Sequence, residues 1–428
     1  MTKDKRNQIA LLVRGTCFTV LILFVSVFLV AQIFTISGES FTAVALFFLV
    51  TACANLFAYT MAVLLCKRIK AIRVSQFACV LACGFICMII FWQSGLENFY
   101  LLFGAIWGTA QGMHFATGQY LTSRSFSAEK TVGYFVWHFG LAALVSVLFP
   151  FTFGLIIDLG SLTITAILVL VIGAIQLTAT FFVKCENAEN KNLRMRKFFR
   201  EVKRHNFRQA SWSLWVIVLL SGFVNVIQVT VTVMVILTFG TNISLGALKS
   251  IFGLCAVIFL ICYKLGKRPV KTTILIMCMI VPFFATLPLL FHIGLVTVAI
   301  FQGGFLIFNK VIMAEEKALK VSAVKYWGGE EYLLESNLFY ATGHWCGKVV
   351  AGSMLLLIGI LGATPLVVAI ILNVMVLMFC IYALGLFLWK RTFKINSGSG
   401  DLSPGTHEDS LVSHPEPVDA QNPQTLSP

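Results

Sequence analysis

Charged residues are scarce in this sequence. Only 12% of its 428 residues are charged, 58% are hydrophobic, and the mean hydropathy is +0.90. Soluble domains carry about 25% charged and about 50% apolar residues, so the composition excludes an ordinary soluble domain and indicates that lipid is the solvent. Long unbroken apolar runs dominate and alternation with a period of two residues is absent, which predicts an all-α membrane protein rather than a β-barrel.

Motifs for several kinds of chemistry are also lacking. The sequence has no Gly-rich phosphate loop, no HExxH and no paired-cysteine zinc motif. Its 12 cysteines lie almost entirely within apolar runs, so a disulfide framework is not expected. Cys79, Cys83 and Cys87 share one helix face without a neighbouring His or carboxylate, and we interpret them as packing residues rather than metal ligands. No catalytic residue, metal site or cofactor is therefore predicted.

Twelve apolar stretches are long enough to cross a membrane. A hydrocarbon core about 30 Å thick needs about 20 residues of helix. The first stretch is too long for the apolar region of a signal peptide and is interpreted as the first span. The predicted spans cover residues 10–34, 41–66, 75–93, 99–121, 132–157, 161–183, 212–239, 245–263, 273–291, 294–313, 337–361 and 365–389.

The basic residues lie on one side of these spans. Nearly all of the 32 Lys and Arg fall before the first span, in the even-numbered loops or after the last span, and the odd-numbered loops hold none. This asymmetry predicts a multi-pass protein of the cell membrane with both termini in the cytoplasm. The net charge of +14 is then a topology signal and an attraction to anionic lipids of the inner leaflet, and nucleic-acid binding is not expected. Arg14, Lys249 and Lys348 are assigned to spans, and Lys310, near the end of the tenth span, is counted with the basic loop that follows it.

The longest basic loop divides the chain into two halves. We expect an N-terminal six-helix bundle over residues 1–183, a basic cytoplasmic linker over 184–211 and a C-terminal six-helix bundle over 212–390. Phe198 and Val202 lie among the cations of the linker, which favours an amphipathic helix on the inner leaflet over a partner-binding helix. Residues 391–428 are rich in Pro, Ser and acidic residues and are predicted to be disordered.

Polar side chains inside the spans are the candidate binding residues. Such groups are costly in hydrocarbon, so they usually face the interior of a helix bundle. The third and ninth spans have almost none, and the sixth and twelfth have only Gln176 and Asn373. The candidates for substrate binding are Arg14, Asn55, Gln111, His114, Asn225, Gln228, Gln302, Tyr340, His344 and Lys348.

Lys348 is the strongest of these candidates. It lies about eleven residues into its span, hence roughly 16 Å deep at about 1.5 Å per residue, and shares a helix face with His344 and Tyr340. The alternative is a lysine satisfied by backbone carbonyls at a packing contact. For Gln111 with His114 and for Asn225 with Gln228 the alternative is hydrogen bonding between helices, and for Arg14 it is snorkelling to the surface.

Carboxylates are missing from the predicted spans. All 18 Asp and Glu are assigned to loops, tails or span ends, and Asp158 and Glu335 come nearest to the membrane interior. A buried carboxylate is the usual proton carrier and the usual partner of a lipophilic cation. The sequence therefore does not match a typical proton-driven exporter of cationic drugs and favours anionic or neutral polar solutes. A histidine could still carry a proton.

Six plus six spans, a long basic middle loop, both ends inside and lipid-like third, sixth, ninth and twelfth spans resemble the major facilitator superfamily. The resemblance covers residues 9 to about 390. It implies eight helices around a central site that opens alternately to each side, supported by four outer helices. The family's Gly-x-x-x-Asp-Arg/Lys-x-Gly-x-Arg/Lys motif is matched in part: Lys67 and Lys70 supply cations, while Ala62 and Cys66 replace Gly and Asp.

These features predict a monomeric secondary active transporter for a small polar or anionic solute, working by alternating access. A lipid or amphiphile flippase on the same scaffold is the main alternative. A sensor or a membrane-embedded enzyme is a further alternative, but the outer loops are only a few residues long and offer little room for an acceptor substrate.

Overall fold

The computed structural model describes residues 3–66, 68–126, 128–184, 194–205, 207–266, 268–326 and 330–392, and these residues contain helices but no strand. The predicted disordered tail lies outside the described residues from 393 onward. Residues 185–193 and 206 of the predicted linker also lie outside them.

The helices of the first half follow the predicted spans closely. The first span consists of α1 (Lys3–Leu23), the π-helical η1 (Phe24–Leu29) and α2 (Val30–Ile36). Ser40 and Ser161 accept hydrogen bonds from the backbone N–H three residues on, which caps the helices that follow them. The other elements are α3 (Phe41–Leu65), α4 (Ala71–Phe91), η2 (Gln93–Gly95), α5 (Leu96–Ser125), α6 (Ala128–Leu159) and α7 (Leu162–Phe181).

The second half begins with a short helix outside the predicted spans, α8 (Met195–Arg204). The seventh predicted span is broken into α9 (Arg208–Leu220) and α10 (Phe223–Phe239). Gly240 then ends α10 in the left-handed conformation, with φ 71°, which glycine adopts without steric cost. The remaining elements are α11 (Asn242–Leu265), α12 (Arg268–Thr286), η3 (Leu287–Leu290), α13 (Leu295–Tyr326), η4 (Glu330–Tyr332), α14 (Leu333–Ile360) and α15 (Pro365–Thr392).

Eleven helical segments of the described chain are long and apolar enough to cross a bilayer, so the chain is a multi-pass membrane protein. The fourth predicted span corresponds to α5, which is not among the eleven. At 30 residues it has the necessary length, but polar residues in its interior, including Gln111 and His114, lower its mean hydropathy.

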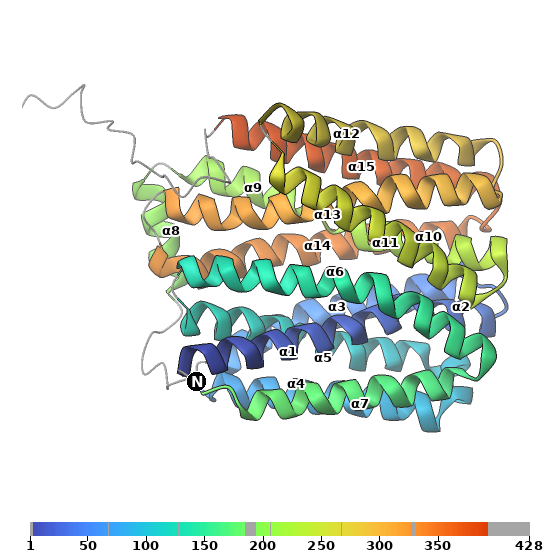
Figure 1. Ribbon diagram of the computed structural model, residues 1–428, viewed down its shortest axis with the longest axis horizontal. Helices are drawn as coiled ribbons and strands as arrows, with labels where there is room; N and C mark the ends of the chain where they lie inside the picture. Colours follow the sequence, from blue (N-terminus) through green and yellow to red (C-terminus); the bar gives the residue numbers. More distant parts are fainter. Residues whose placement is uncertain are drawn as a thin grey trace, which may run out of the picture.

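The helices of the two halves form two neighbouring groups, with α1 to α7 in the lower part of Figure 1 and most of α9 to α15 in the upper part. The most extensive contacts between the groups join α3 with α14 and α6 with α11, and α2 also meets α10 and α5 also meets α14. We call the end that holds residues 37–40 and 240–241 the clasped end. The end that holds Lys3 and Thr392, at the left in Figure 1, is the terminal end.

Backbone packing closes the two groups against each other toward the clasped end. A Cβ atom on Gly246 of α11 would lie 2.2 Å from the carbonyl oxygen of Pro150 in α6, so only glycine permits this approach. A Cβ atom on Gly359 of α14 would lie 2.2 Å from Thr42 Oγ1 of α3. Asp158, at the end of α6, accepts hydrogen bonds from Asn242 Nδ2 (2.8 Å) and the Ile243 backbone N–H (2.8 Å). Its carboxylate also complements the dipole at the start of α11.

The linker helix α8 differs from its prediction. Its apolar face packs on the protein: Phe198 is 1% exposed and its ring lies 6.2 Å from that of Phe339 in α14. The Arg194 backbone N–H donates to Glu335 Oε1 at 3.0 Å. The expectation that the buried face of this helix lies in the inner leaflet is therefore wrong for Phe198 and Val202, because α14 and its neighbours cover them. The basic side chains of α8 remain exposed.

Helix α13 continues well past the predicted end of the tenth span at residue 313. It contains Glu315 and Glu316, which are 6% and 7% exposed and fall within the candidate span Leu295–Lys320. The expectation that no carboxylate lies in a span is therefore wrong. Each acid has partners: Tyr263 Oη (2.7 Å) and Lys390 Nζ (2.5 Å) for Glu315, and Tyr382 and Lys320 for Glu316. This pairing with tyrosines and lysines makes their burial tolerable.

Candidate functional site

A cavity of about 230 Å³ lies between the two helix groups. Its walls come from the first, second, fourth, fifth, seventh, eighth, tenth and eleventh predicted spans, the eight that were expected to surround a central site. Within the described chain, α4, α7, α12 and α15 contribute no lining residue. The polar and aromatic lining residues are Thr19, Ser26, Phe47, Phe48, Thr51, Trp107, Gln111, Ser146, Asn225, Gln228, Lys249, Lys310, Trp345 and Lys348.

The first helix of each group is interrupted beside this cavity. In the first half the interruption is η1, a π-helical segment that contributes Val25, Ser26 and Val27 to the wall. In the second half it is the break between α9 and α10, where a Cβ atom on Gly222 would lie 2.4 Å from the Lys348 backbone nitrogen. Irregular helix of this kind inside a membrane is tolerated where it lines a cavity or is buried in protein, and it often marks binding sites.

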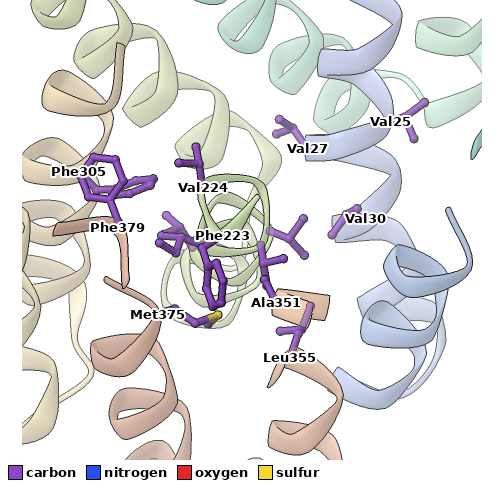
Figure 2. Close-up of a cluster of buried hydrophobic side chains, with 14 of the residues drawn as sticks. Val25, Val27, Val30, Phe223, Val224, Phe305, Ala351, Leu355, Met375 and Phe379 are labelled. Atoms are coloured by element: carbon purple, nitrogen blue, oxygen red, sulfur yellow. The ribbon is translucent and has the colours of Figure 1, made fainter. Parts of the chain in front are cut away.

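Apolar side chains of the first helix line the cavity opposite α10. Figure 2 shows Val27 and Val30 pointing from the first helix toward α10, where Phe223 and Val224 lie. Val27 and Val30 also line the cavity, and each is at most 4% exposed. Beyond Val30, toward the clasped end, α2 contacts α10.

Three lysines line the cavity, and all come from the second half. They are Lys249 of α11, Lys310 of α13 and Lys348 of α14. The ammonium of Lys348 lies 4.0 Å from the centre of the Trp345 ring, a cation–π contact. Among the described residues none of the three lysines forms an ion pair. Lys348 itself is 8% exposed.

Lys310 is a lining residue that the sequence analysis missed. It lies inside the predicted tenth span, three residues before its end at residue 313, but was counted with the basic loop that follows. Helix α13 instead continues to Tyr326, which places Lys310 near its middle. Lys310 follows Leu306 by four residues within that span, so the helical period alone places it on the same face as Leu306, which also lines the cavity.

Amide and hydroxyl groups supply the other polar contacts. Gln111, Asn225 and Gln228 line the cavity from both halves. Asn55 lies behind Gln111 and donates from Nδ2 to Gln111 Oε1 at 2.6 Å, which fixes the orientation of that amide. Thr51 Oγ1, also in the wall, is buried without a hydrogen-bond partner. Hydrogen-bonding capacity is therefore available to a polar ligand.

Arg14 and His114 lie outside the cavity wall. Arg14 is 2% exposed and donates from Nη2 to the His114 carbonyl oxygen (2.9 Å) and to Thr117 Oγ1 (2.8 Å), so it does not snorkel to the surface. The His114 ring stacks on Phe18 with centroids 3.5 Å apart, and its Nδ1 lies 3.1 Å from Gln176 Nε2. These contacts tie α1, α5 and α7 together within the first half.

Tyr340, His344 and Gln302 also lie outside the wall. His344 Nδ1 is 2.7 Å from Ser221 Oγ at the break in the seventh span. The histidine side chain is therefore hydrogen-bonded to that break. Tyr340 is 2% exposed. Gln302 is buried within the second half and neither side-chain polar atom has a partner. The shared helix face of Tyr340, His344 and Lys348 is real, but the cavity reaches only Lys348 and its neighbour Trp345.

Comparison with known proteins agrees with this architecture. The family model described as Major Facilitator Superfamily matches residues 9–314. The solved nucleoside transporter NupG is 13% identical, with a TM-score of 0.56 over 92% of this chain and 100% of that chain. The D323A mutant of NupG is 10% identical, with a TM-score of 0.58 over the same shares. These similarities show a common fold. No curated protein sequence matches this chain.

Proposed function

Because the chain belongs to the Major Facilitator Superfamily, we propose that it is a secondary active transporter of a small polar or anionic solute. The observation that carries this proposal is the cavity between the two helix groups, with lysines, amides and hydroxyls in its wall. The family and the fold favour a transporter over an enzyme.

The proposed architecture has twelve membrane crossings in two six-helix bundles. Residues 1–183 would form the first bundle, 184–211 the linker and 212–390 the second bundle, with α5 as the crossing that hydropathy alone does not identify. The distribution of the basic residues favours an orientation in which the terminal end faces the cytoplasm and the clasped end faces the outside of the cell. The exposed cations of α8 would then face anionic lipid head groups at the inner leaflet. We propose a monomer, because the cavity is complete within one chain.

Alternating access is the proposed mechanism. The glycine contacts between α6 and α11 and between α3 and α14 hold the clasped end shut, with the cavity on the other side of them. If the two bundles rock about the cavity, these contacts must separate to admit solute from the outside. The hydrogen bonds that Asp158 accepts at the start of α11 are exposed. Water can therefore replace them at a small cost in free energy.

The size and the polar lining of the cavity favour solute transport over the flippase alternative. The cavity is smaller than the roughly 300 Å³ at which drug-sized sites begin, and its polar groups line one common volume. A long acyl chain would need a different, lateral opening. NupG is a nucleoside transporter, and nucleosides are among the neutral polar candidates for this chain.

The proposed function predicts that a water-soluble solute stabilises the purified protein in detergent without added lipid. A ligand that binds only the folded state stabilises it by about 2.7 kcal/mol when its concentration is about 100 times Kd. A thermal-shift screen over sugars, organic anions, amino acids and nucleosides measures this directly. Stabilisation by lipids or other amphiphiles alone would favour the flippase instead.

A further inference from the structure

We propose that the cavity selects small organic anions carrying at least two negative charges, the chemistry of dicarboxylates and phosphomonoesters. The proposal rests on the proposed transport function and narrows its substrate class. Its basis is the set of three lysines, Lys249, Lys310 and Lys348, around one small cavity.

The charges at the cavity are one-sided. Three different helices of the second half each contribute one ammonium group, and no Asp, Glu or Arg is among the lining residues. The first half contributes only neutral groups, including Gln111, Thr51 and Trp107. Its buried cation, Arg14, is directed elsewhere and bonded to His114 and Thr117. An anion would therefore bind against the second half.

The two buried acids of α13 already have partners. Glu315 is paired with Tyr263 and Lys390, and Glu316 with Tyr382 and Lys320. Both lie on α13 beyond Lys310 and neither lines the cavity. The three lining lysines therefore have no protein carboxylate as counter-ion. Under this condition an anion that binds beside them gains the most electrostatic binding free energy.

The number of lysines sets the charge of the ligand. Like charges gathered in a cavity of about 230 Å³ repel one another because the surrounding hydrocarbon screens them weakly. A neutral solute leaves this repulsion in place and a single negative charge offsets only part of it. Two or more negative charges on one molecule can contact separate ammonium groups. The volume restricts such a ligand to a small skeleton.

The test compares ligands that share a skeleton and differ in charge. Purified full-length protein is titrated with succinamide, succinamate and succinate, which carry no, one and two negative charges. A second series compares glycerol with glycerol 3-phosphate. Together the two series show whether the cavity prefers carboxylate or phosphate groups. We expect succinate or glycerol 3-phosphate to bind at least about tenfold more tightly than the less charged members of its series, about 1.4 kcal/mol or more.

Neutral substitutions identify the groups responsible. Lys249→Gln and Lys310→Gln should each weaken binding of the dianion at least about tenfold and reduce the preference for the dianion over the neutral analogue. Lys203→Gln is the matched control, because Lys203 lies exposed on α8 and its loss removes the same charge from the protein. The control variant should bind the dianion as the unmodified protein does.

Two results would overturn the proposal. One is equal affinity across the charge series, and the other is failure of every dianion to bind while the protein remains folded. Either result leaves the proposed function standing if a neutral or singly charged solute is carried by the reconstituted protein. The proposed function itself fails if no water-soluble solute of any charge is carried.

Discussion

Replacing Gly246 with leucine should lower solute transport by about one to two orders of magnitude while the protein still inserts into the membrane. A Cβ atom at this position would lie 2.2 Å from the Pro150 carbonyl oxygen and 2.8 Å from its carbonyl carbon, both backbone atoms that cannot rotate away. The larger side chain therefore keeps α11 and α6 apart at the clasped end. Overpacking of this kind typically costs about 1–3 kcal/mol, and each 1.36 kcal/mol corresponds to about tenfold in rate. Initial uptake rates in proteoliposomes measure the effect.

The control for this variant is Gly84→Leu. Gly84 is also a helical glycine, on α4, and a Cβ atom there meets nothing within 4 Å, so transport should be unchanged. Gly246→Ala should fall between the leucine variant and the unmodified protein, because a single methyl group requires a smaller displacement. Full transport by Gly246→Leu would show that closure of α6 on α11 is not part of the cycle.

Replacing Lys348 with alanine should abolish transport of the substrate and leave folding intact. Its ammonium lies against the Trp345 ring in the cavity wall and pairs with no carboxylate of the described chain. Removing a buried charge that has no partner leaves no other charge uncompensated, so little loss of stability is expected. Lys348→Arg should retain part of the activity, since a planar guanidinium replaces a compact ammonium. Uptake and the melting temperature are measured together.

Lys70→Ala provides the comparison, because Lys70 is an exposed lysine before α4 and its loss should change neither quantity. Unimpaired uptake by Lys348→Ala would exclude a role of this lysine in substrate binding. A melting temperature that falls together with uptake would instead indicate a packing role.

The positions of the spans could be predicted from sequence because hydropathy and the one-sided distribution of Lys and Arg are independent signals that agree. The predictions were least accurate where a helix leaves the hydrocarbon. Helix α13 continues to Tyr326 through a charged stretch, and Glu315 and Glu316 are accommodated there by tyrosines and lysines from α11, α15 and α13 itself. Lys320 follows Glu316 by four residues, but Tyr263, Tyr382 and Lys390 come from distant parts of the chain and leave no local pattern.

The candidate site was predictable in kind more than in detail. Lys348, Gln111, Asn225 and Gln228 were named because polar groups in spans tend to face the bundle interior, and they line the cavity. His114 satisfies the same rule by bonding within one half. One span cannot reveal whether a polar face meets a cavity or a neighbouring helix, since that depends on how tightly the helices approach. Here the close approach of the helices depends on glycine contacts, such as that of Gly222 with the Lys348 backbone.

The central claim is that one cavity between the two halves is reached from each side of the membrane in turn. Cysteine placed at Gln228, a lining residue, tests it in a background where the exposed native cysteines are replaced. Cysteines at Gly240 and Gly266 mark the proposed outer and inner faces. We predict that a membrane-impermeant thiol reagent modifies the Gln228 position slowly from either face, that a bound solute protects it, and that Gly246→Leu accelerates modification from outside. Modification from one face only, unaffected by Gly246→Leu, would contradict alternating access through this cavity.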